Sequence, residues 1–377
     1  MNKNHYDYII CGGGASGLLL AFRMCNDPFF KDQSILLIEK ESKNTNDKTW
    51  CFWESRESDL EPIVYKKWIK AYFGAHDFEM DFEMDPFQYK MIRSIDFYQY
   101  MKNQLASLNQ LTQIKEKVCE ISENEVTTDV QSYQGDKIFS SIFDPKNLYQ
   151  QQKYPVLLQH FVGQIVQTQK ACFDPDKIEF MNFKVPQKGN TRFMYLLPLT
   201  PNKALLEYTL FSENPLDHKE YVNAIAAFLK QLPTGGYEIL EEEEGKIPMT
   251  CYRFDLKNST KLLHIGTAGG WTKASTGYTF QRINEKTKAL VEFLKKGQPL
   301  NQFSKRDRFW FYDLLFIDVL SKDNANGADL FRRMFQKNKP ENIFNFLNEK
   351  STIGQEILIM RSFNVLQFVG ALRKRLF

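Results

Sequence analysis

The sequence predicts an α/β fold whose first unit is β-α-β and whose first sheet is therefore parallel. Residues 6–11 form a short apolar run, a glycine-rich turn follows at residues 12–17, and residues 18–24 have the composition of a good helix. Residues 34–39 are a second apolar run that ends in an acidic residue. Two buried strands joined through a helix pair in parallel, because the connection must cross over one face of the sheet.

The glycine turn has the spacing Gly12-x-Gly14-x-x-Gly17 between a strand and a helix. The first glycine permits a tight turn, the second lets the backbone approach a pyrophosphate, and the third allows close packing of helix on strand. Glu39 ends the next strand, where a carboxylate can accept hydrogen bonds from ribose hydroxyls. We therefore predict a dinucleotide site rather than a tight turn without a ligand. The residues expected to form it are Gly12, Gly14, Ala15, Ser16, Gly17, Glu39 and Lys40.

A second glycine cluster at residues 266–270 follows a third apolar run at residues 261–265. The next helix is expected to begin near Thr276, with its N-terminal N–H groups aimed at phosphate or at a flavin ring. Two separate glycine turns after strands favour FAD, an extended ligand that touches both, over an ordinary strand-to-helix loop. This half of the FAD site is predicted to contain Gly266, Gly269, Gly270, Thr276, Gly277 and Tyr278.

The remaining patterns predict a strand-rich middle and a helical end. Residues 192–197 and 204–211 flank a Pro201-Asn202 turn and predict a β-hairpin. The acidic run at 241–244 predicts a solvated loop rather than a metal site. In chain order we also expect short strands within 60–100, a helix over 96–111, a small antiparallel sheet over 117–144, strands over 155–211, a helix over 218–231 and helices from about 300 onward.

Among the carboxylates of the sequence, Glu207 is the candidate for a catalytic role. On the predicted strand it shares a face with Leu205, Thr209 and Phe211, because alternate residues of a strand point to the same side. Burial among these neighbours raises a carboxyl pKa and keeps the group protonated, as a general acid requires. The alternative is an exposed acid on a half-solvated strand, which the local pattern alone slightly favours.

Residues 47–54 combine charged side chains with two tryptophans and a phenylalanine. A loop is normally polar, so this composition predicts either a loop packed on the core or a loop that closes over a cofactor or a flat apolar substrate. On the second interpretation, Trp50 joins the predicted cofactor site.

Composition excludes several classes of function. The chain has 377 residues, and its 49 basic against 46 acidic residues give no nucleic-acid character. The six cysteines form no C-x-x-C pair, so we expect no metal site and free thiols in a reducing compartment. The 32 Phe and 17 Tyr residues suit an aromatic core or a cavity for a large apolar ligand.

The two ends of the chain bear on its location. The N-terminal residues lead directly into a strand and do not resemble a signal peptide, and no apolar run reaches the length of a transmembrane helix. Residues 363–377 are apolar with a basic cluster. Such a segment can lie on an anionic membrane surface or dock on the core as a helix.

Several segments together resemble the bacterial, FAD-dependent branch of the lycopene cyclase family, and they occur in the family's order. The segments at 47–54 and 265–280 are the most specific, whereas the helical C-terminal part carries little signature. The resemblance rests on residues 12–18, 47–54, 159–163, 193–198, 206–212, 247–250 and 265–280.

This resemblance implies an FAD-binding fold like that of p-hydroxybenzoate hydroxylase. Such a fold has a Rossmann-type FAD-binding domain, a mixed-sheet substrate domain and, here, a helical C-terminal part. The implied boundaries are 1–60, 96–150 and 255–300 for a discontinuous FAD-binding domain, 61–95 and 151–254 for the substrate-binding domain, and 301–377 for the helical region.

The resemblance also implies cyclisation of the linear ψ-ends of lycopene, or of a related carotenoid, into β-ionone rings. The family's catalytic acid precedes a threonine by two residues, which matches Glu207-Tyr208-Thr209 and so favours Glu207 as the acid over the exposed alternative. Reduced FAD is the implied stabiliser of the carbocation, NADPH the implied electron source, and peripheral contact with the cytoplasmic side of the membrane the implied location. Two departures are Asn182, where the family often has Asp, and Lys146, where it often has Arg.

Two rival functions remain open on the residues. An FAD-dependent monooxygenase acting on a large apolar substrate would share the fold, because function depends on the site and not on the fold. A non-catalytic, membrane-associated flavoprotein would share the cofactor site but would tolerate replacement of Glu207.

Overall fold

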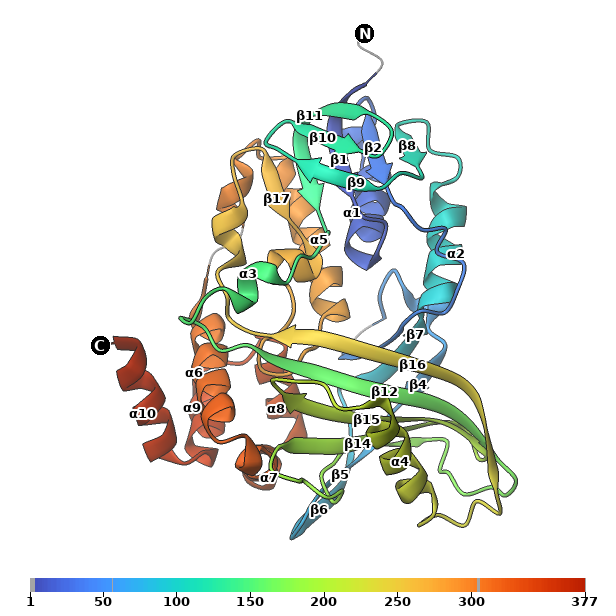
Figure 1. Cartoon of the computed structure of the whole chain (residues 1–377), viewed down its shortest axis with the longest axis vertical. Coiled ribbons are helices and arrows are strands. Elements are labelled where there is room, and N and C mark those ends of the chain that lie inside the picture. Colours follow the sequence, from blue (N-terminus) through green and yellow to red (C-terminus); the bar gives the residue numbers. More distant parts are fainter. Residues whose placement is uncertain (1–3, 56, 304–305, 377) are drawn as a thin grey trace.

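The computed structural model describes residues 4–55, 57–303 and 306–376. Residues 1–3 and 377, which the predicted segments include, lie outside the described residues. One sheet and its helices form the upper part of the molecule, a second sheet of long strands crosses the lower part, and the C-terminal helices lie beside both (Figure 1). Among the helices outside the C-terminal part, α2 (Ser94–Leu105), α3 (Lys146–Tyr149) and α4 (His218–Leu229) connect or cover these sheets.

The first sheet confirms the predicted β-α-β unit, because β1 (His5–Cys11) pairs in parallel with β2 (Ile35–Ile38) and the intervening helix is α1 (Ala15–Cys25). On the other side of β1, β11 (Ser132–Ser140) pairs with it in parallel, and β17 (Leu262–His264) pairs in parallel with β11. The predicted small antiparallel sheet is the extension formed by β9 (Val118–Ile121), β10 (Glu125–Thr128) and β11. The strand order is β8 (Leu111–Ile114), β2 (Ile35–Ile38), β1 (His5–Cys11), β11 (Ser132–Ser140), β10 (Glu125–Thr128) and β9 (Val118–Ile121), and β17 (Leu262–His264) pairs with β11.

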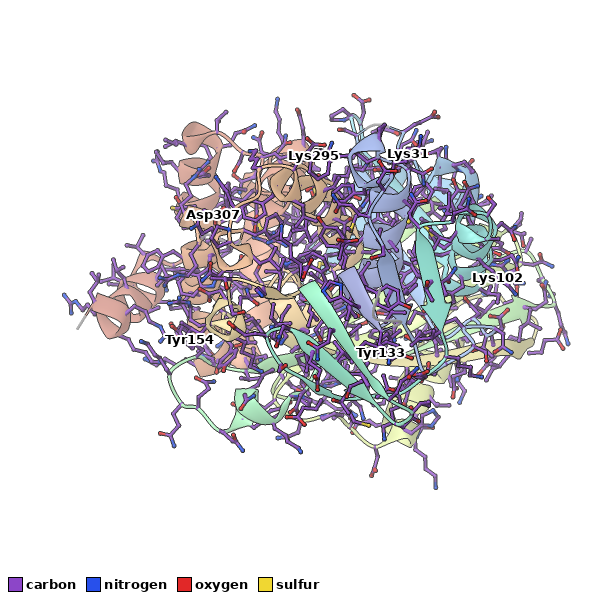
Figure 2. All side chains as sticks on the ribbon, turned by 90° about the horizontal axis from the view of Figure 1, so that it is seen from above. Lys31, Lys102, Tyr133, Tyr154, Lys295 and Asp307 are labelled. Carbon is purple, nitrogen blue, oxygen red and sulfur yellow. The ribbon has the colours of Figure 1, made fainter. Side chains whose placement is uncertain are left out.

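Alternating side chains let this sheet pack on both faces. Ile10 and Leu37 pack toward α1 and α5 (Phe280–Leu294), whereas Ile9 and Leu36 pack toward the extension, where they meet Tyr133. Seen from above, the strands of the extension, with Tyr133 labelled, lie on the opposite side of the sheet from α1 (Figure 2). Strands buried on both faces explain why the sequence shows continuous apolar runs here.

The second sheet is mixed and contains the predicted hairpin, since β14 and β15 pair in antiparallel across the turn at Pro201 and Asn202. β13 pairs in parallel with β5, and the other pairs are antiparallel. One face packs on α4, and the opposite face is directed toward the first sheet. The order is β16 (Tyr237–Met249), β12 (Leu157–Thr168), β15 (Lys203–Ser212), β14 (Thr191–Thr200), β13 (Lys177–Asn182), β5 (Lys70–Ala75) and β6 (Phe78–Glu83).

A third, small sheet corrects the prediction of a loop over residues 47–54. Residues Thr49–Glu54 form β3, which pairs in antiparallel with β7 (Gln88–Arg93), and β7 in turn pairs with β4 (Lys66–Trp68). The aromatic residues of β3 are therefore the buried side chains of a strand. Its partner lies about forty residues along the chain, so local sequence does not reveal the pairing.

Three further boundaries differ from the predictions. The helix expected over 96–111 is α2, which ends at Leu105, and a strand begins at Leu111. The helix expected near Thr276 is α5, which begins at Phe280, because Gly277 has a φ of 75° that a right-handed helix cannot contain. The acidic run at 241–244 belongs to β16 and is not a loop.

The helical C-terminal part is confirmed and is tied to the rest by buried charges. Lys273, which is 2% exposed and follows the second glycine cluster, contacts Asp313 of α6 at 2.9 Å and Glu349 at 3.1 Å. α10 docks on α6 through ion pairs of Lys374 and Arg375 with Asp318. The helices are α6 (Arg308–Lys322), α7 (Gly327–Lys337), α8 (Pro340–Leu347), α9 (Ile353–Ser362) and α10 (Val365–Leu376).

Within the described residues, no helix has both the length and the apolar character needed to cross a membrane. The domain boundaries inferred from the sequence stay a prediction.

Candidate active site

The glycine turn at the start of α1 is built around contacts that exclude side chains. Gly12 has a φ of 100°, in the left-handed region that favours glycine. A Cβ on Gly17 would lie 1.9 Å from the carbonyl oxygen of Gly12, so the helix can approach the strand only with glycine there. By contrast, a Cβ on Gly14 would meet no atom within 4 Å. The backbone at Gly14 is therefore open to a ligand.

Glu39 stabilises this turn directly. Its Oε2 accepts a hydrogen bond from the Gly13 N–H at 2.6 Å, and its Oε1 accepts one from the Glu41 N–H at 2.9 Å. The carboxylate thus holds the turn as well as standing where a ribose would bind. Lys40 is exposed and pairs with Glu41 at 3.5 Å.

The start of α1 has the features of an anion site. No side chain caps its first N–H groups, and its first turn contains no acidic residue. Unpaired N–H groups at a helix N-terminus and the positive end of the helix dipole favour a phosphate. Ala15 and Ser16, the first two residues of α1, line a large cavity. These features fit a negatively charged group such as the pyrophosphate of FAD.

This main cavity has a volume of about 480 Å³ and reaches from the glycine turn to the second sheet. Its floor is one face of β14, β15, β12 and β16, and β3 contributes to a wall. Its size is in the range of cavities that bind cofactors and small substrates. The main cavity is lined, among others, by Ala15, Ser16, Thr49, Trp50, Cys51, Tyr89, Gln159, Phe161, Tyr195, Leu205, Glu207, Glu243, Thr267, Gly277, Tyr278 and Phe280.

The second glycine cluster touches the main cavity only in part. Gly266 packs against Ser16, since a Cβ there would lie 2.6 Å from the Ser16 Oγ, and the adjacent Thr267 lines the cavity. Gly269 and Gly270 instead line a smaller cavity of about 110 Å³. The structure therefore brings the two glycine turns together through Gly266.

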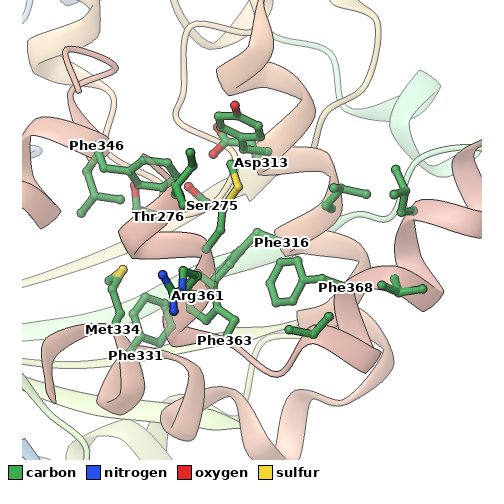
Figure 3. A pocket seen from close by; sticks show the side chains of 18 residues that line it. Ser275, Thr276, Asp313, Phe316, Phe331, Met334, Phe346, Arg361, Phe363 and Phe368 are labelled. Carbon is green, nitrogen blue, oxygen red and sulfur yellow. The ribbon is translucent and has the colours of Figure 1, made fainter. Parts of the chain in front are cut away.

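The turn before α5 separates two cavities. Gly277 and Tyr278 line the main cavity, as predicted for cofactor contacts. Thr276, in contrast, lines an apolar cavity of about 350 Å³ among the C-terminal helices, where Phe316 and Phe368 also project (Figure 3). The hydroxyl of Thr276 is buried without a hydrogen-bond partner among the described residues.

Trp50 faces the main cavity and packs on aromatic neighbours. Its ring stacks on Phe280, with the ring centroids 4.8 Å apart and the planes 20° from parallel, and meets Phe97 edge-on. Trp50 thus links β3 to the first turn of α5.

Glu207 lies on the cavity face of β15, in the position expected of a buried acid. Its Oε1 accepts a hydrogen bond from the Thr209 hydroxyl at 2.6 Å, and Leu205 and Tyr195 lie beside it on the same face. The pKa of Glu207 is raised to about 8, chiefly by burial, and this net value includes the lowering effect of the Thr209 hydrogen bond and a smaller raising effect of the nearby Glu243 carboxyl. Glu207 is therefore protonated at neutral pH and can donate a proton into the cavity.

Three tyrosine hydroxyls stand next to Glu207. Tyr278 contacts Tyr89 at 3.2 Å and Tyr195 at 3.1 Å, and Trp53 packs edge-on against Tyr278 with the ring centroids 4.4 Å apart. Burial raises the pKa of each tyrosine well above its usual value, so these hydroxyls remain neutral. The three tyrosines line the cavity, and mutual hydrogen bonds position their hydroxyls.

Several lining residues were not identified from the sequence. Cys51, Tyr89, Tyr195 and Glu243 reach the cavity from strands that pair only in the folded chain. Gln159 belongs to a segment that resembled the family, but without a role. The Gln159 Oε1 is buried and has no hydrogen-bond partner among the described residues. It lies only 2.0 Å from the position that a Cβ on Gly277 would occupy. This orphaned acceptor is a candidate ligand contact.

The raised pKa of Glu207 has a consequence for stability. In the unfolded chain the carboxyl ionises near 4.5, but in the folded chain it ionises at about 8. Between these values the folded state binds more protons, so the free energy of unfolding contributed by Glu207 falls as the pH rises, by roughly 1.4 kcal/mol per pH unit. Glu207→Gln is expected to remove this slope and to be more stable than the parent at pH 8.

Urea denaturation of the FAD-free protein, from about pH 5 to 8, measures that slope. Glu242→Gln is the control, because Glu242 is an exposed glutamate of the same sheet, on β16. Parallel pH curves for the parent and Glu207→Gln would show that the carboxyl is not desolvated in the folded chain.

Across residues 4–55, 57–303 and 306–376, no group of three or more His, Cys, Asp or Glu side chains could hold a metal ion. The polar groups that line the main cavity include the start of α1, the carboxyls of Glu207 and Glu243, and the tyrosine hydroxyls.

The architecture defines the class of the protein: it has the fold of FAD-dependent enzymes related to p-hydroxybenzoate hydroxylase. A geranylgeranyl bacteriochlorophyll reductase-like protein from Thermoplasma acidophilum superposes with a TM-score of 0.60 at 10% identity, covering 95% of this chain and 96% of that one. A flavin-dependent brominase superposes with a TM-score of 0.57 at 14% identity, over 98% and 97%. A probable FAD-dependent monooxygenase from Pseudomonas aeruginosa gives 0.55 at 10% identity, over 92% and 100%.

Within this class, the chain belongs to the lycopene cyclase family: the model described as "Lycopene cyclase protein" matches residues 7–373. A chromoplastic capsanthin/capsorubin synthase from Citrus sinensis is 22% identical over 395 residues, which cover 94% of this chain and 76% of the relative. A lycopene beta-cyclase from Pantoea ananas is 25% identical over 256 residues, and these cover 65% of this chain but only 63% of the relative.

Proposed function

We propose that this enzyme is a lycopene β-cyclase that converts the linear ψ-ends of lycopene into β-ionone rings by acid catalysis, without net oxidation or reduction. The observation that carries the proposal is the Glu207 carboxyl, whose pKa is raised to about 8 by burial in the cavity that begins at the glycine turn. Proton addition to an alkene needs a neutral acid in a site that excludes water.

In the proposed mechanism, Glu207 donates its proton to the terminal double bond of a ψ-end. The tertiary cation that forms is attacked by the next double bond, which closes a six-membered ring, and loss of a ring proton gives the β-ring. The faces of Tyr195, Tyr278 and Tyr89 stabilise positive charge by cation–π interaction. Thr209 orients the acid through its hydrogen bond at 2.6 Å.

FAD is the proposed cofactor. The glycine turn and the start of α1 would hold its pyrophosphate, Glu39 its ribose, and Trp50, Gly277 and Tyr278 would contact it across the main cavity. When bound in its reduced, anionic form, the flavin would supply negative charge next to the developing cation.

NADPH is the proposed reductant. If so, FAD-loaded protein supplied with neither NADPH nor another reductant should not turn over.

The rival activity is an FAD-dependent monooxygenase acting on a large apolar substrate. Expression in bacteria that accumulate lycopene, followed by pigment analysis, separates the possibilities. A cyclase gives a ring-containing isomer of unchanged mass, a monooxygenase gives a product that contains added oxygen, and a non-catalytic flavoprotein leaves lycopene unchanged. The proposal fails if the oxygenated product appears or if the pigment is unaltered while the flavoprotein is present.

We also propose that the C-terminal helices contact the cytoplasmic side of the membrane, where an apolar substrate would be met. Several large apolar side chains of α9 and α10 are exposed to solvent, and the most exposed are Ile353 at 67%, Val365 at 65% and Leu366 at 81%. α10 also ends in a basic cluster. Apolar side chains flanked by basic ones suit an anionic lipid surface.

Substitution at the most exposed of these positions tests the membrane contact. Leu366→Glu is expected to reduce the affinity for vesicles containing phosphatidylserine, measured by co-sedimentation, by about a hundredfold. This corresponds to the loss of one buried leucine and the addition of one repelled charge. Val130→Glu is the control, since Val130 is also exposed, at 67%, but lies in the loop between β10 and β11. Equal sedimentation of the two variants would place the contact elsewhere.

A further inference from the structure

Two glutamates, not one, face the main cavity from the second sheet. Gly163 of β12 is paired with Glu207 of β15 on one side and with Glu243 of β16 on the other. Residues directly opposite one another in antiparallel strands project from the same face. Glu207, Gly163 and Glu243 therefore form one row across the sheet, and both carboxyls line the main cavity.

Gly163, between the two glutamates, has no side chain, and the side chains of Leu205 and Glu243 pack over it. With strands spaced by about 4.8 Å, the backbones of Glu207 and Glu243 are roughly 10 Å apart. A Cβ on Gly163 would lie 3.2 Å from a Leu205 methyl and 3.3 Å from the Glu243 Cγ, tighter than ordinary contacts. The glycine at this position therefore lets Leu205 and Glu243 pack closely over β12, and both glutamates line the main cavity.

The two carboxyls differ in the hydrogen bonds that they accept. Glu243 accepts one from the Thr49 hydroxyl at 2.8 Å and another from the Thr49 backbone N–H. Glu207 accepts one, from Thr209. Hydrogen bonds donated to a carboxyl oxygen favour the ionised form, so Glu243 is the more easily ionised of the pair.

The pKa values have the same order. Burial raises the pKa of Glu243 to about 7, against the lowering effect of Thr49, and that of Glu207 to about 8. Lys48 lowers the pKa of Glu243, whereas Glu241 raises it. Two nearby carboxyls in a low-dielectric site do not both ionise readily, so one protonated and one ionised group is the favoured state.

Redox-neutral cyclisation needs both a protonated carboxyl and an ionised one. One proton is added at the chain end, and one is lost from a carbon next to the cation after the ring has closed, so the two transfers occur at different carbons. We propose that Glu243 is the base that accepts the ring proton in the reaction that Glu207 starts. This inference rests on the proposed function and assigns the second half of the same reaction.

The transfer balances in protons and electrons. The O–H bond of Glu207 breaks as a C–H bond forms at the chain end, and a C–C bond then closes the ring. The C–H bond at the ring carbon next to the cation breaks, its electron pair becomes the new double bond, and its proton goes to the Glu243 carboxylate. After the product leaves, Glu243 loses that proton to water and Glu207 takes one up from water, which restores the enzyme without any other co-reactant.

Glu243→Gln tests the assignment, because the amide keeps an oxygen for Thr49 but cannot accept the proton. The rate of lycopene cyclisation is expected to fall by roughly a hundredfold, with FAD content and KM unchanged, since a positioned base contributes about that much. The residual product is expected to contain rings with a shifted double bond, because the trapped cation loses a proton from another adjacent carbon. Glu243→Asp, which keeps a carboxylate, is expected to restore much of the rate and the original ring.

Glu242→Gln is the matched control, since Glu242 is next in sequence and bonds to Gln164 on the other face of the sheet. Parent rate and parent ring type in Glu243→Gln would overturn the inference. So would equal losses in Glu243→Gln and Glu243→Asp with an unchanged ring type, because they would indicate a structural role. Neither result affects Glu207: the proposed function fails separately, if Glu207→Gln remains active.

Discussion

Glu207→Gln is expected to lower the rate of lycopene cyclisation by about 10³-fold or more, the upper part of the range for loss of a general acid. Glutamine has the same size and can still accept the Thr209 hydrogen bond, but it has no acidic proton to give to a double bond. The neighbouring tyrosines cannot replace it, because burial raises their pKa values far above neutrality. Pigment analysis by chromatography measures the conversion.

The control for this loss of activity is that Glu207→Gln still folds and still binds FAD. FAD absorbance and the melting temperature of Glu207→Gln should match or exceed those of the parent, because removal of a desolvated carboxyl stabilises the folded state. Glu179→Gln is the matched substitution: burial also raises the pKa of that carboxyl, but it bonds to Asn182 on β13 and does not line the main cavity. If Glu207→Gln and Glu179→Gln cyclise lycopene equally well, Glu207 is not the acid.

Gly14→Val is expected to reduce bound FAD to less than about a tenth, a loss of at least 1.4 kcal/mol in binding free energy. The added side chain would meet no protein atom, since a Cβ on Gly14 has nothing within 4 Å, and the backbone φ of −81° suits valine. It would instead occupy the space expected for the pyrophosphate. Flavin fluorescence released from the purified protein measures the bound FAD.

The melting temperature of the FAD-free protein separates cofactor exclusion from misfolding. It should be unchanged in Gly14→Val but lower in Gly17→Val, whose side chain would collide with the Gly12 carbonyl. Gly370→Ala, in an equally open position on α10, is expected to change neither quantity. Full FAD occupancy in Gly14→Val would show that the cofactor does not approach this turn.

The parts of this fold that sequence predicts are those whose partners are near in the chain. The β-α-β unit, the hairpin around Pro201 and the C-terminal helices follow from local periodicity and turn residues. The face of β15 on which Glu207 lies can also be predicted, because side chains alternate along a strand and residues two apart share a face. The glycine turn can be predicted from sequence because the steric reasons for its glycines lie within the turn itself.

The parts that sequence does not reveal depend on distant pairing. β3 looked like a loop because its partner, β7, lies about forty residues later. Glu243 looked like one more solvated acid in a run of four, and only the register of β16 on β12 turns its side chain into the main cavity. Gly269 and Thr276 were grouped with the cofactor residues by proximity in sequence, but each lines a different cavity.

The central claim is that this enzyme adds one proton and removes another, with no change in oxidation state. Incubation of the reduced, FAD-loaded enzyme with lycopene in D₂O, without oxygen, tests it most directly, because the proton of Glu207 exchanges with solvent. Mass spectrometry should find a cyclic product one mass unit heavier for each ring in D₂O and of the same mass as lycopene in H₂O. A cyclic product without deuterium, or a product that contains oxygen when air is admitted, would contradict the account.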